Sequence, residues 1–213
     1  MIKAVLFDLD GTLLYTLPDM ALALNFGLRS RGFPPRTLEE VRRFVGSGVP
    51  ALVERAAPPE TPEAERAAVE QAYQEYYAVH RMDHTAPYPG IPELLRELRE
   101  RGIAVGVVTN KLHADAAPML EGSLAGLVDQ IEGEKEGRPR KPRPDAALDA
   151  LKALGATPAE GIFVGDSGID AETGRNAGMK TVLVAWGYRD EEELRTYPAA
   201  GIIRRPEELL AYL

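Results

Sequence analysis

The stretch AVLFDLDGT, residues 4–12, is the part of the sequence that decides the fold. It begins as a short apolar run, which is typical of a strand in a parallel sheet that is buried on both faces. Asp8 and Asp10 follow with one residue between them, and Gly11 permits an immediate turn. Sites in such sheets form at the carboxyl ends of the strands. The stretch therefore predicts a strand that ends in a polar site, although Asp10 and Thr12 could instead cap a helix after a turn.

Further short apolar segments alternate with amphipathic segments along the chain. Pro92 and Pro144 lie where helices are expected to begin, and Gly102, Gly155 and Gly178 lie where they are expected to end. This alternation predicts an α/β fold, a Rossmann-like doubly wound parallel sheet. The expected strands are residues 4–8, 103–109, 128–132, 161–165, 181–185 and 201–203.

One interval is too long for this alternation. Asp8 and Thr109 lie 101 residues apart, whereas a strand-helix-strand unit takes roughly 30 residues. Residues 16–83 show no strand pattern, so we expect an inserted all-helical domain there, with residues 1–15 and 84–213 forming the Rossmann-like core. The four expected helices run from Asp19 to Arg31, from a capping box at Thr37 and Glu40, from near Ala51, and from Thr61 and Pro62.

The composition excludes several classes of protein. The chain has 213 residues, 45% of them apolar and 27% charged, as expected for a globular protein. It has no cysteine, which excludes disulfides and thiolate chemistry. The net charge of −8 argues against nucleic acid as a partner, and the absence of a long apolar run argues against a membrane span. We expect a cytoplasmic protein, and the oligomeric state cannot be read from the sequence.

A second pair of acids, Asp166 and Asp170, follows the expected strand 161–165. Taken alone, these acids would equally well begin a helix. If the two strands are neighbours, however, Asp8, Asp10, Asp166 and Asp170 converge. Two like charges ~4 Å apart repel by about 4 kcal/mol at an effective dielectric constant near 20, so the group needs a cation or a proton. Ligands that are all oxygen favour Mg²⁺.

Three more residues could bind phosphate in the same place. Thr109 and Asn110 end the expected strand 103–109, where a hydroxyl and backbone amides could meet phosphate oxygens, although a Thr-Asn helix cap is as good an interpretation. Lys141 lies in the run RPRKPR, residues 138–143. Such a run is most often a solvated loop, but its prolines could hold Lys141 as a fixed charge.

In this order, Asp8-x-Asp10-x-Thr12, Thr109-Asn110, Lys141-Pro142 and Gly165-Asp166-x3-Asp170 resemble the four motifs of the haloacid dehalogenase superfamily. The helical insertion is similar to the cap domain of that family. The segments FVGSG (44–48) and LVER (52–55) resemble the cap of its phosphoglycolate phosphatases, and Lys111 after Asn110 points the same way. The resemblance implies an Mg²⁺-dependent phosphatase for a small phosphorylated metabolite, with 2-phosphoglycolate as the leading substrate.

The resemblance also implies roles for individual residues. Asp8 would be the nucleophile that forms an aspartyl-phosphate, and Asp10 the general acid and base. The cap would close over the site and read the organic part of the substrate. The implied catalytic residues are Asp8, Asp10, Thr109 and Lys141; the substrate-binding residues are Thr12, Thr109, Asn110 and Lys141; and the metal ligands are Asp8, Asp10 through its backbone carbonyl, Asp166 and Asp170, the last through water or Lys141.

Other activities of the superfamily remain open to different degrees. Asp10 argues against a dehalogenase, and the absence of lysine from residues 16–82 argues against a phosphonate hydrolase that uses a cap lysine. A related phosphatase or pyrophosphatase and a hexose-phosphate mutase remain alternatives. A non-catalytic phosphate-binding protein is the alternative from another class, although it would gain nothing from a positioned acid such as Asp10.

Some residues fit the resemblance poorly or have no assigned role. Family members commonly have Asp-Ser near the position of Tyr15 and Thr16, and Gly174 interrupts a helix at a cost of about 1 kcal/mol relative to Ala. His80 and His84 have a spacing that could hold a metal on a helix, but a polar hinge surface is the simpler interpretation. His113 could touch a substrate or simply lie at an exposed helix start.

Overall fold

A computed structural model describes all residues, 1–213, and divides into two compact units. The first consists of Met1–Leu14 and Pro87–Leu213, and the second is Tyr15–Ala86. The chain passes from one unit to the other at two short strands, β2 (Leu14–Tyr15) and β3 (Ala86–Pro87), which pair with each other. No helix is both long enough and apolar enough to cross a membrane.

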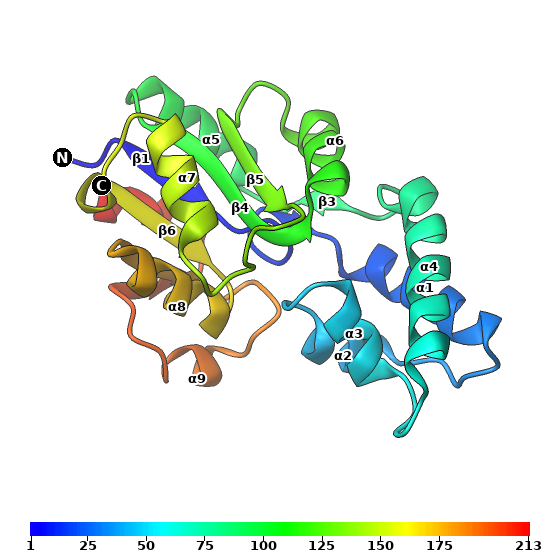
Figure 1. Cartoon of the computed structure of the whole chain (residues 1–213). Helices are drawn as coiled ribbons and strands as arrows, with labels where there is room; N and C mark the ends of the chain where they lie inside the picture. The colour runs from blue at the N-terminus through cyan, green and yellow to red at the C-terminus, as the bar shows by residue number, and fades with distance from the viewer. The chain divides into compact units, whose positions relative to one another are not determined.

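The first unit is built on a parallel sheet of six strands in the order β5-β4-β1-β6-β7-β8 (Figure 1). This confirms the predicted α/β class and the parallel sheet. Strand β1 lies between β4 and β6, with Phe7 opposite Val107 on one side and Val164 on the other. The polar segments that follow these three strands therefore lie next to one another. The strands are β1 (Ala4–Phe7), β4 (Ala104–Leu112), β5 (Gln130–Glu134), β6 (Gly161–Gly165), β7 (Lys180–Val184) and β8 (Gly201–Ile203).

Helices cover both faces of this sheet, as Figure 1 shows for α7 and α8 on the near face and α5 behind. On the near face, Leu6 and Phe163 of the sheet are fully buried among the alanines of α7 and the end of α8. The elements are α5 (Ile91–Glu100), α6 (His113–Leu124), α7 (Asp145–Ala153), α8 (Gly168–Ala177), α9 (Glu191–Leu194) and the 3₁₀ helices Pro158–Glu160 and Pro206–Tyr212.

Gly174, for which the sequence offered no reason, lies where α8 packs on β7. A Cβ atom at this position would lie 2.0 Å from the side-chain oxygen of Thr181 and 3.2 Å from the Cβ of Phe163. Any larger residue would push the helix away from the sheet, so the close packing of α8 outweighs the unfavourable helix propensity of glycine.

Strands β4 and β5 differ from the predicted segments 103–109 and 128–132. Strand β4 continues to Leu112, and its register with β5 shifts between Val108 and Leu112. Strand β5 begins at Gln130, two residues later than predicted. The Asp129 carboxylate accepts from the Val105 N–H at 2.8 Å, and the Asp129 backbone N–H donates to the Val105 carbonyl at 2.8 Å. Thr109 and Asn110, expected at the end of a strand, therefore lie within an irregular part of β4.

The second unit is helical, with α1 (Leu17–Ser30), α2 (Leu38–Phe44), α3 (Val49–Ala56) and α4 (Glu63–His80). The capping box is present: the Thr37 hydroxyl accepts from the Glu40 N–H at 3.2 Å, and the Glu40 carboxylate accepts from the Thr37 N–H at 2.7 Å. Helix α4 begins at Glu63, just after the predicted start at Thr61 and Pro62, and the Thr61 hydroxyl donates to the Pro58 carbonyl. Tyr73 and Tyr77 are buried and form part of this unit's core.

Candidate active site

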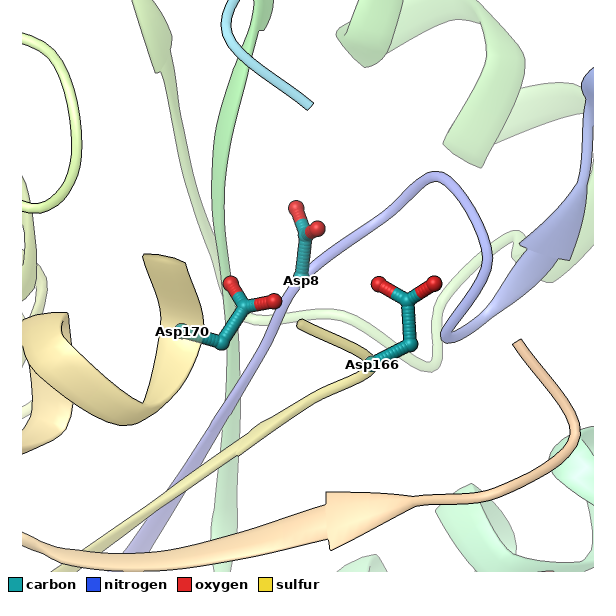
Figure 2. Close-up of side chains that lie close together, drawn as sticks. All are labelled: Asp8, Asp166 and Asp170. Carbon is teal, nitrogen blue, oxygen red and sulfur yellow. The ribbon is translucent and has the colours of Figure 1, made fainter. Parts of the chain in front are cut away.

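Three aspartates meet where β1 and β6 end. Asp8 follows β1, Asp166 follows β6, and Asp170 lies in the first turn of α8. One carboxylate oxygen from each lies within 4.8 Å of the other two, and all three side chains face a common point (Figure 2). Asp166 is 3% exposed and Asp170 is fully buried. Of the four acids that the sequence predicts to converge, the structure therefore groups Asp8, Asp166 and Asp170, whereas Asp10 is not part of this group.

The charges of this cluster are only partly balanced by Lys141. Its ammonium lies 2.8 Å from Asp8 Oδ1 and 2.8 Å from Asp170 Oδ1. Burial lowers the pKa of Lys141, but the charges of Asp170 and Asp8 outweigh burial and raise that pKa above its ordinary value. Lys141 is therefore a permanent cation inside the cluster.

The pKa values of two of these acids, Asp8 and Asp166, are raised in the folded chain. Burial raises the pKa of Asp8 to about 6, although Lys141 opposes the increase. Burial and the charges of Asp170 and Asp8 raise the pKa of Asp166 well above its ordinary value. Each increase means that the folded chain stabilises the charged carboxylate less well than water does.

The Asn110 side chain holds the backbone of Lys141 through two hydrogen bonds. The Asn110 side chain accepts from the Lys141 N–H at 2.8 Å and donates to the Lys141 carbonyl at 3.2 Å. The sequence predicts that Asn110 offers its backbone amide to phosphate, and in the structure its side chain also binds the backbone of Lys141. Thr109 is also buried, and its hydroxyl accepts from the Lys111 N–H at 3.3 Å.

The basic run 138–143 is not the freely solvated loop that such composition usually indicates. Arg138 binds the Glu132 carboxylate and the Gly133 carbonyl, and Arg140 binds Glu134. The two acids are two residues apart on β5, and the two arginines are two residues apart in the loop. These pairs tie the loop to β5 immediately before Lys141.

Asp10 lies outside the group of three and has a lysine partner of its own. Lys111 Nζ is 3.0 Å from each carboxylate oxygen of Asp10. Both side chains are mostly buried, with 6% of Lys111 and 13% of Asp10 exposed. The charge of Asp10 still reaches Asp8, where it adds to the increase in pKa. Thr12 is fully buried, and its hydroxyl has no hydrogen-bond partner.

The loop after β7 also contributes to the site, which the sequence did not indicate. The Tyr188 N–H donates to Asp166 Oδ2 at 2.6 Å, and the Trp186 indole donates to the Thr12 carbonyl at 3.1 Å. Gly11 has a φ of +84°, and a Cβ there would lie 2.4 Å from Asp166 Oδ2. The turn after β1, the end of β6 and the loop after β7 are therefore packed closely together.

The histidines are not brought together. His80 Nδ1 lies 2.8 Å from the Asp83 carboxylate, whereas His84 Nδ1 lies 2.7 Å from Asp19. These separate partners leave no shared metal site on the two residues. His113 lies at the start of α6, as predicted. Its Nδ1 atom is buried and has no hydrogen-bond partner, so the side chain is not fully exposed.

The residues present fit a divalent cation. Four carboxylates, Asp8, Asp10, Asp166 and Asp170, accompany two ammonium groups, Lys111 and Lys141, which leaves two formal negative charges in a mostly buried space. Burying uncompensated charge is costly. The donor atoms are all oxygen, with neither His nor Cys in the cluster, as Mg²⁺ prefers.

Comparison with known proteins identifies the family. The chain matches the model of the haloacid dehalogenase-like hydrolases over residues 5–184 and belongs to this family, so it is an enzyme of the hydrolase class. It is 35% identical to the phosphoglycolate phosphatase of Aquifex aeolicus over 187 residues, covering 87% of this chain and 86% of the relative.

Two further proteins extend the similarity to nearly the whole chain. A phosphoglycolate phosphatase of Cereibacter sphaeroides is 35% identical over 209 residues, covering 96% of this chain and 94% of that one. A crystal structure from Haemophilus somnus, described as a predicted phosphoglycolate phosphatase, aligns with a TM-score of 0.93 and 28% identity, covering 99% and 97% of the two chains. The fold and the family are therefore shared over both units.

Proposed function

We propose that this hydrolase is an Mg²⁺-dependent phosphatase that hydrolyses 2-phosphoglycolate through an aspartyl-phosphate. The observation that carries the proposal is the buried group of Asp8, Asp166 and Asp170 with Lys141 at its centre. The curated relatives described above are phosphoglycolate phosphatases, which supports the choice of substrate.

In the first step, a carboxylate oxygen of Asp8 attacks phosphorus. A bond forms between that oxygen and phosphorus, and the bond from phosphorus to the ester oxygen breaks. Asp10, which has taken up a proton from solvent before this step, gives that proton to the departing alkoxide, which would otherwise be a poor leaving group. Lys141, together with Thr109 and the backbone N–H of Asn110, stabilises the negative charge on the phosphoryl oxygens.

In the second step, Asp10 takes a proton from a water molecule, and that water attacks phosphorus. The bond between Asp8 and phosphorus breaks, which releases inorganic phosphate and restores the carboxylate. Asp8, Asp166 and the Asp10 backbone carbonyl would hold Mg²⁺, with Asp170 orienting a ligand water or Lys141. When bound, the ion neutralises negative charge on the phosphoryl group.

The helical unit, Tyr15–Ala86, is proposed to be the cap that reads the organic part of the substrate. This unit lacks features that other activities would need. Residues 16–82 contain no lysine, and the nearby His80 and His84 are engaged with Asp83 and Asp19. A phosphatase is therefore favoured over a mutase or a phosphonate hydrolase.

The test is release of inorganic phosphate from a panel of compounds: 2-phosphoglycolate, a hexose phosphate, pyrophosphate and an aryl phosphate, with Mg²⁺ and with EDTA. We expect the highest kcat/KM for 2-phosphoglycolate, and no turnover in EDTA until Mg²⁺ is restored. If another compound ranks far above 2-phosphoglycolate, the substrate assignment is wrong. If no compound is hydrolysed at high enzyme concentration, the chain is a phosphate-binding protein instead.

A further inference from the structure

Lys111 is a cation that the proposed chemistry does not use. It lies three residues beyond Val108 on β4, and its side chain is only 6% exposed. Its ammonium touches both oxygens of Asp10 at 3.0 Å, and this is a different carboxylate from the two that hold Lys141. The site therefore holds two lysines with separate positions: one among the three aspartates and one on Asp10.

The position of Lys111 favours contact with the leaving group rather than with the phosphoryl group. Proton transfer from Asp10 requires the ester oxygen to come within hydrogen-bond distance of the Asp10 carboxylate. The same carboxylate is in direct contact with the Lys111 ammonium. A leaving group whose ester oxygen reaches Asp10 would therefore bring its first atoms close to Nζ.

A leaving group with a carboxylate close to the ester oxygen would meet this cation. In 2-phosphoglycolate the carboxylate carbon is only two bonds from the ester oxygen. An ammonium has three donors and is a compact point charge, so it can contact Asp10 and a substrate oxygen together. The mostly buried position strengthens such a contact, because water screens the charges less there.

We infer that Lys111 is a specificity-determining residue that selects phosphomonoesters whose leaving group carries a carboxylate next to the ester carbon. The inference rests on the proposed phosphatase function and goes beyond it by assigning recognition of the carboxylate of the leaving group to the sheet unit, in addition to whatever contacts the proposed cap makes with the rest of that group. An ester of a neutral alcohol would find the same catalytic groups but no partner for Lys111. The preference for the acid over a neutral analogue of equal size should therefore depend on this one ammonium.

The experiment compares 2-phosphoglycolate with 2-phosphoglycolamide, its neutral isostere, in the wild type and in Lys111→Met and Lys111→Arg. We expect wild-type kcat/KM to favour the acid by about tenfold or more, as a hydrogen bond between charged groups can provide. Lys111→Met should remove most of this ratio, mainly through a higher KM for the acid, and Lys111→Arg should retain part of it.

Two controls separate selectivity from folding and from positioning of Asp10. Lys152→Met removes the same charge from the exposed end of α7 and should leave the ratio unchanged. An aryl phosphate, whose leaving group needs no proton, reports whether each variant still has a working nucleophile, and thermal unfolding reports whether it folds.

Three results would overturn the inference. If Lys111→Met lowers kcat/KM for the acid and the amide equally, Lys111 only positions Asp10. If the wild type hydrolyses both compounds equally well, no group in the site selects the carboxylate, although the phosphatase function stands. If the wild type hydrolyses no phosphate ester at all, the proposed function fails and the inference fails with it.

Discussion

The molecule has buried aspartates in two regions, and the two regions differ in the hydrogen-bond donors that surround the carboxylates. Asp19, in α1 of the helical unit, is 1% exposed. Its oxygens accept from the His84 N–H at 3.0 and 3.1 Å and from the Thr85 hydroxyl at 2.8 Å, and His84 Nδ1 lies 2.7 Å away. These donors come from the segment through which the chain leaves the unit. Asp19 therefore joins the two ends of the helical unit.

At the ends of β1 and β6, by contrast, three carboxylates lie close to one another, and their donors are unevenly shared: Asp170 accepts from the Ser167 N–H and hydroxyl at 3.1 and 2.6 Å and from Lys141, which also contacts Asp8. Asp166 has one backbone donor, Tyr188, and the charges of Asp170 and Asp8 add to the increase in its pKa. A buried carboxylate surrounded by donors stabilises a fold, whereas buried carboxylates that converge destabilise it until a cation or proton arrives. The difference indicates which buried acids serve structure and which serve chemistry.

The largest expected effect comes from Asp8→Asn. The amide cannot act as the nucleophile, so we expect kcat for 2-phosphoglycolate to fall by roughly a thousandfold or more while the thermal unfolding profile is retained. Phosphate release measures the change, and Glu121→Gln, on the exposed side of α6, is the control. Substantial turnover in an Asn variant of verified mass would show that Asp8 is not the nucleophile.

The second-largest effect is expected from Asp19→Asn, which tests the buried aspartate of the helical unit. The substitution removes the charge and one acceptor from three donors that are fixed by the fold, so we expect the free energy of unfolding to fall by about 1–3 kcal/mol. Denaturant unfolding measures the loss, and limited proteolysis should show faster cleavage near His84.

Asp83→Asn is the matched control for Asp19, because Asp83 pairs with the other histidine, His80, but is 51% exposed. Asp83→Asn should lower the free energy of unfolding by less than about 0.5 kcal/mol. If Asp19→Asn were no more damaging than Asp83→Asn, Asp19 would not be the structural tie that its contacts indicate.

The third effect has the opposite sign for the same chemical change. Asp166→Asn removes a like charge from the cluster but keeps an acceptor for Tyr188, so we expect the free energy of unfolding in EDTA to rise by about 1 kcal/mol. Adding Mg²⁺ should stabilise the wild type and not the variant, since a ligand that binds only the folded state raises its stability. A variant that is less stable than the wild type in EDTA would remove the distinction between the two regions.

The acids of the site could be predicted from the sequence because each follows a strand within its own short motif. Asp8 comes directly after the apolar run of β1, and Asp166 directly after that of β6. The alternation of strands and helices predicts the fold class but does not fix the strand order, so the convergence was predicted only on the condition that the two strands are neighbours. The structure meets that condition by pairing β1 with β6.

The partners of these acids could not be predicted, because they depend on distances between remote segments. Lys111 lies 101 residues from Asp10, and the Trp186 indole meets the backbone of Thr12 across 174 residues. The side-chain role of Asn110 depends on the shifted register of β4 and on the course of the loop that carries Lys141. The tie between Asp19 and His84 likewise needs the two ends of the helical unit to be placed.

Glu132 is a third kind of buried acid: it lies next to the site, and several donors surround its carboxylate. Burial raises its pKa, but hydrogen bonds from Arg138, Lys135 and Gln130 outweigh burial and lower it. It resembles Asp19 in its saturation with donors, yet its main partner, Arg138, lies three residues before Lys141. It therefore stabilises a loop on which the chemistry depends.

The smallest expected effect follows from Arg138→Gln. Loss of the bonds to Glu132 and to the Gly133 carbonyl should let the loop move, and misplacement of Lys141 should raise KM for the phosphate ester and Ki for inorganic phosphate by roughly threefold to tenfold, with a smaller change in kcat. Arg138→Lys should recover part of the affinity. The control is Arg143→Gln in the same loop, whose side chain is 69% exposed. If Arg138→Gln and Arg143→Gln left Ki equally unchanged, the pairs along β5 would stabilise the fold without positioning Lys141.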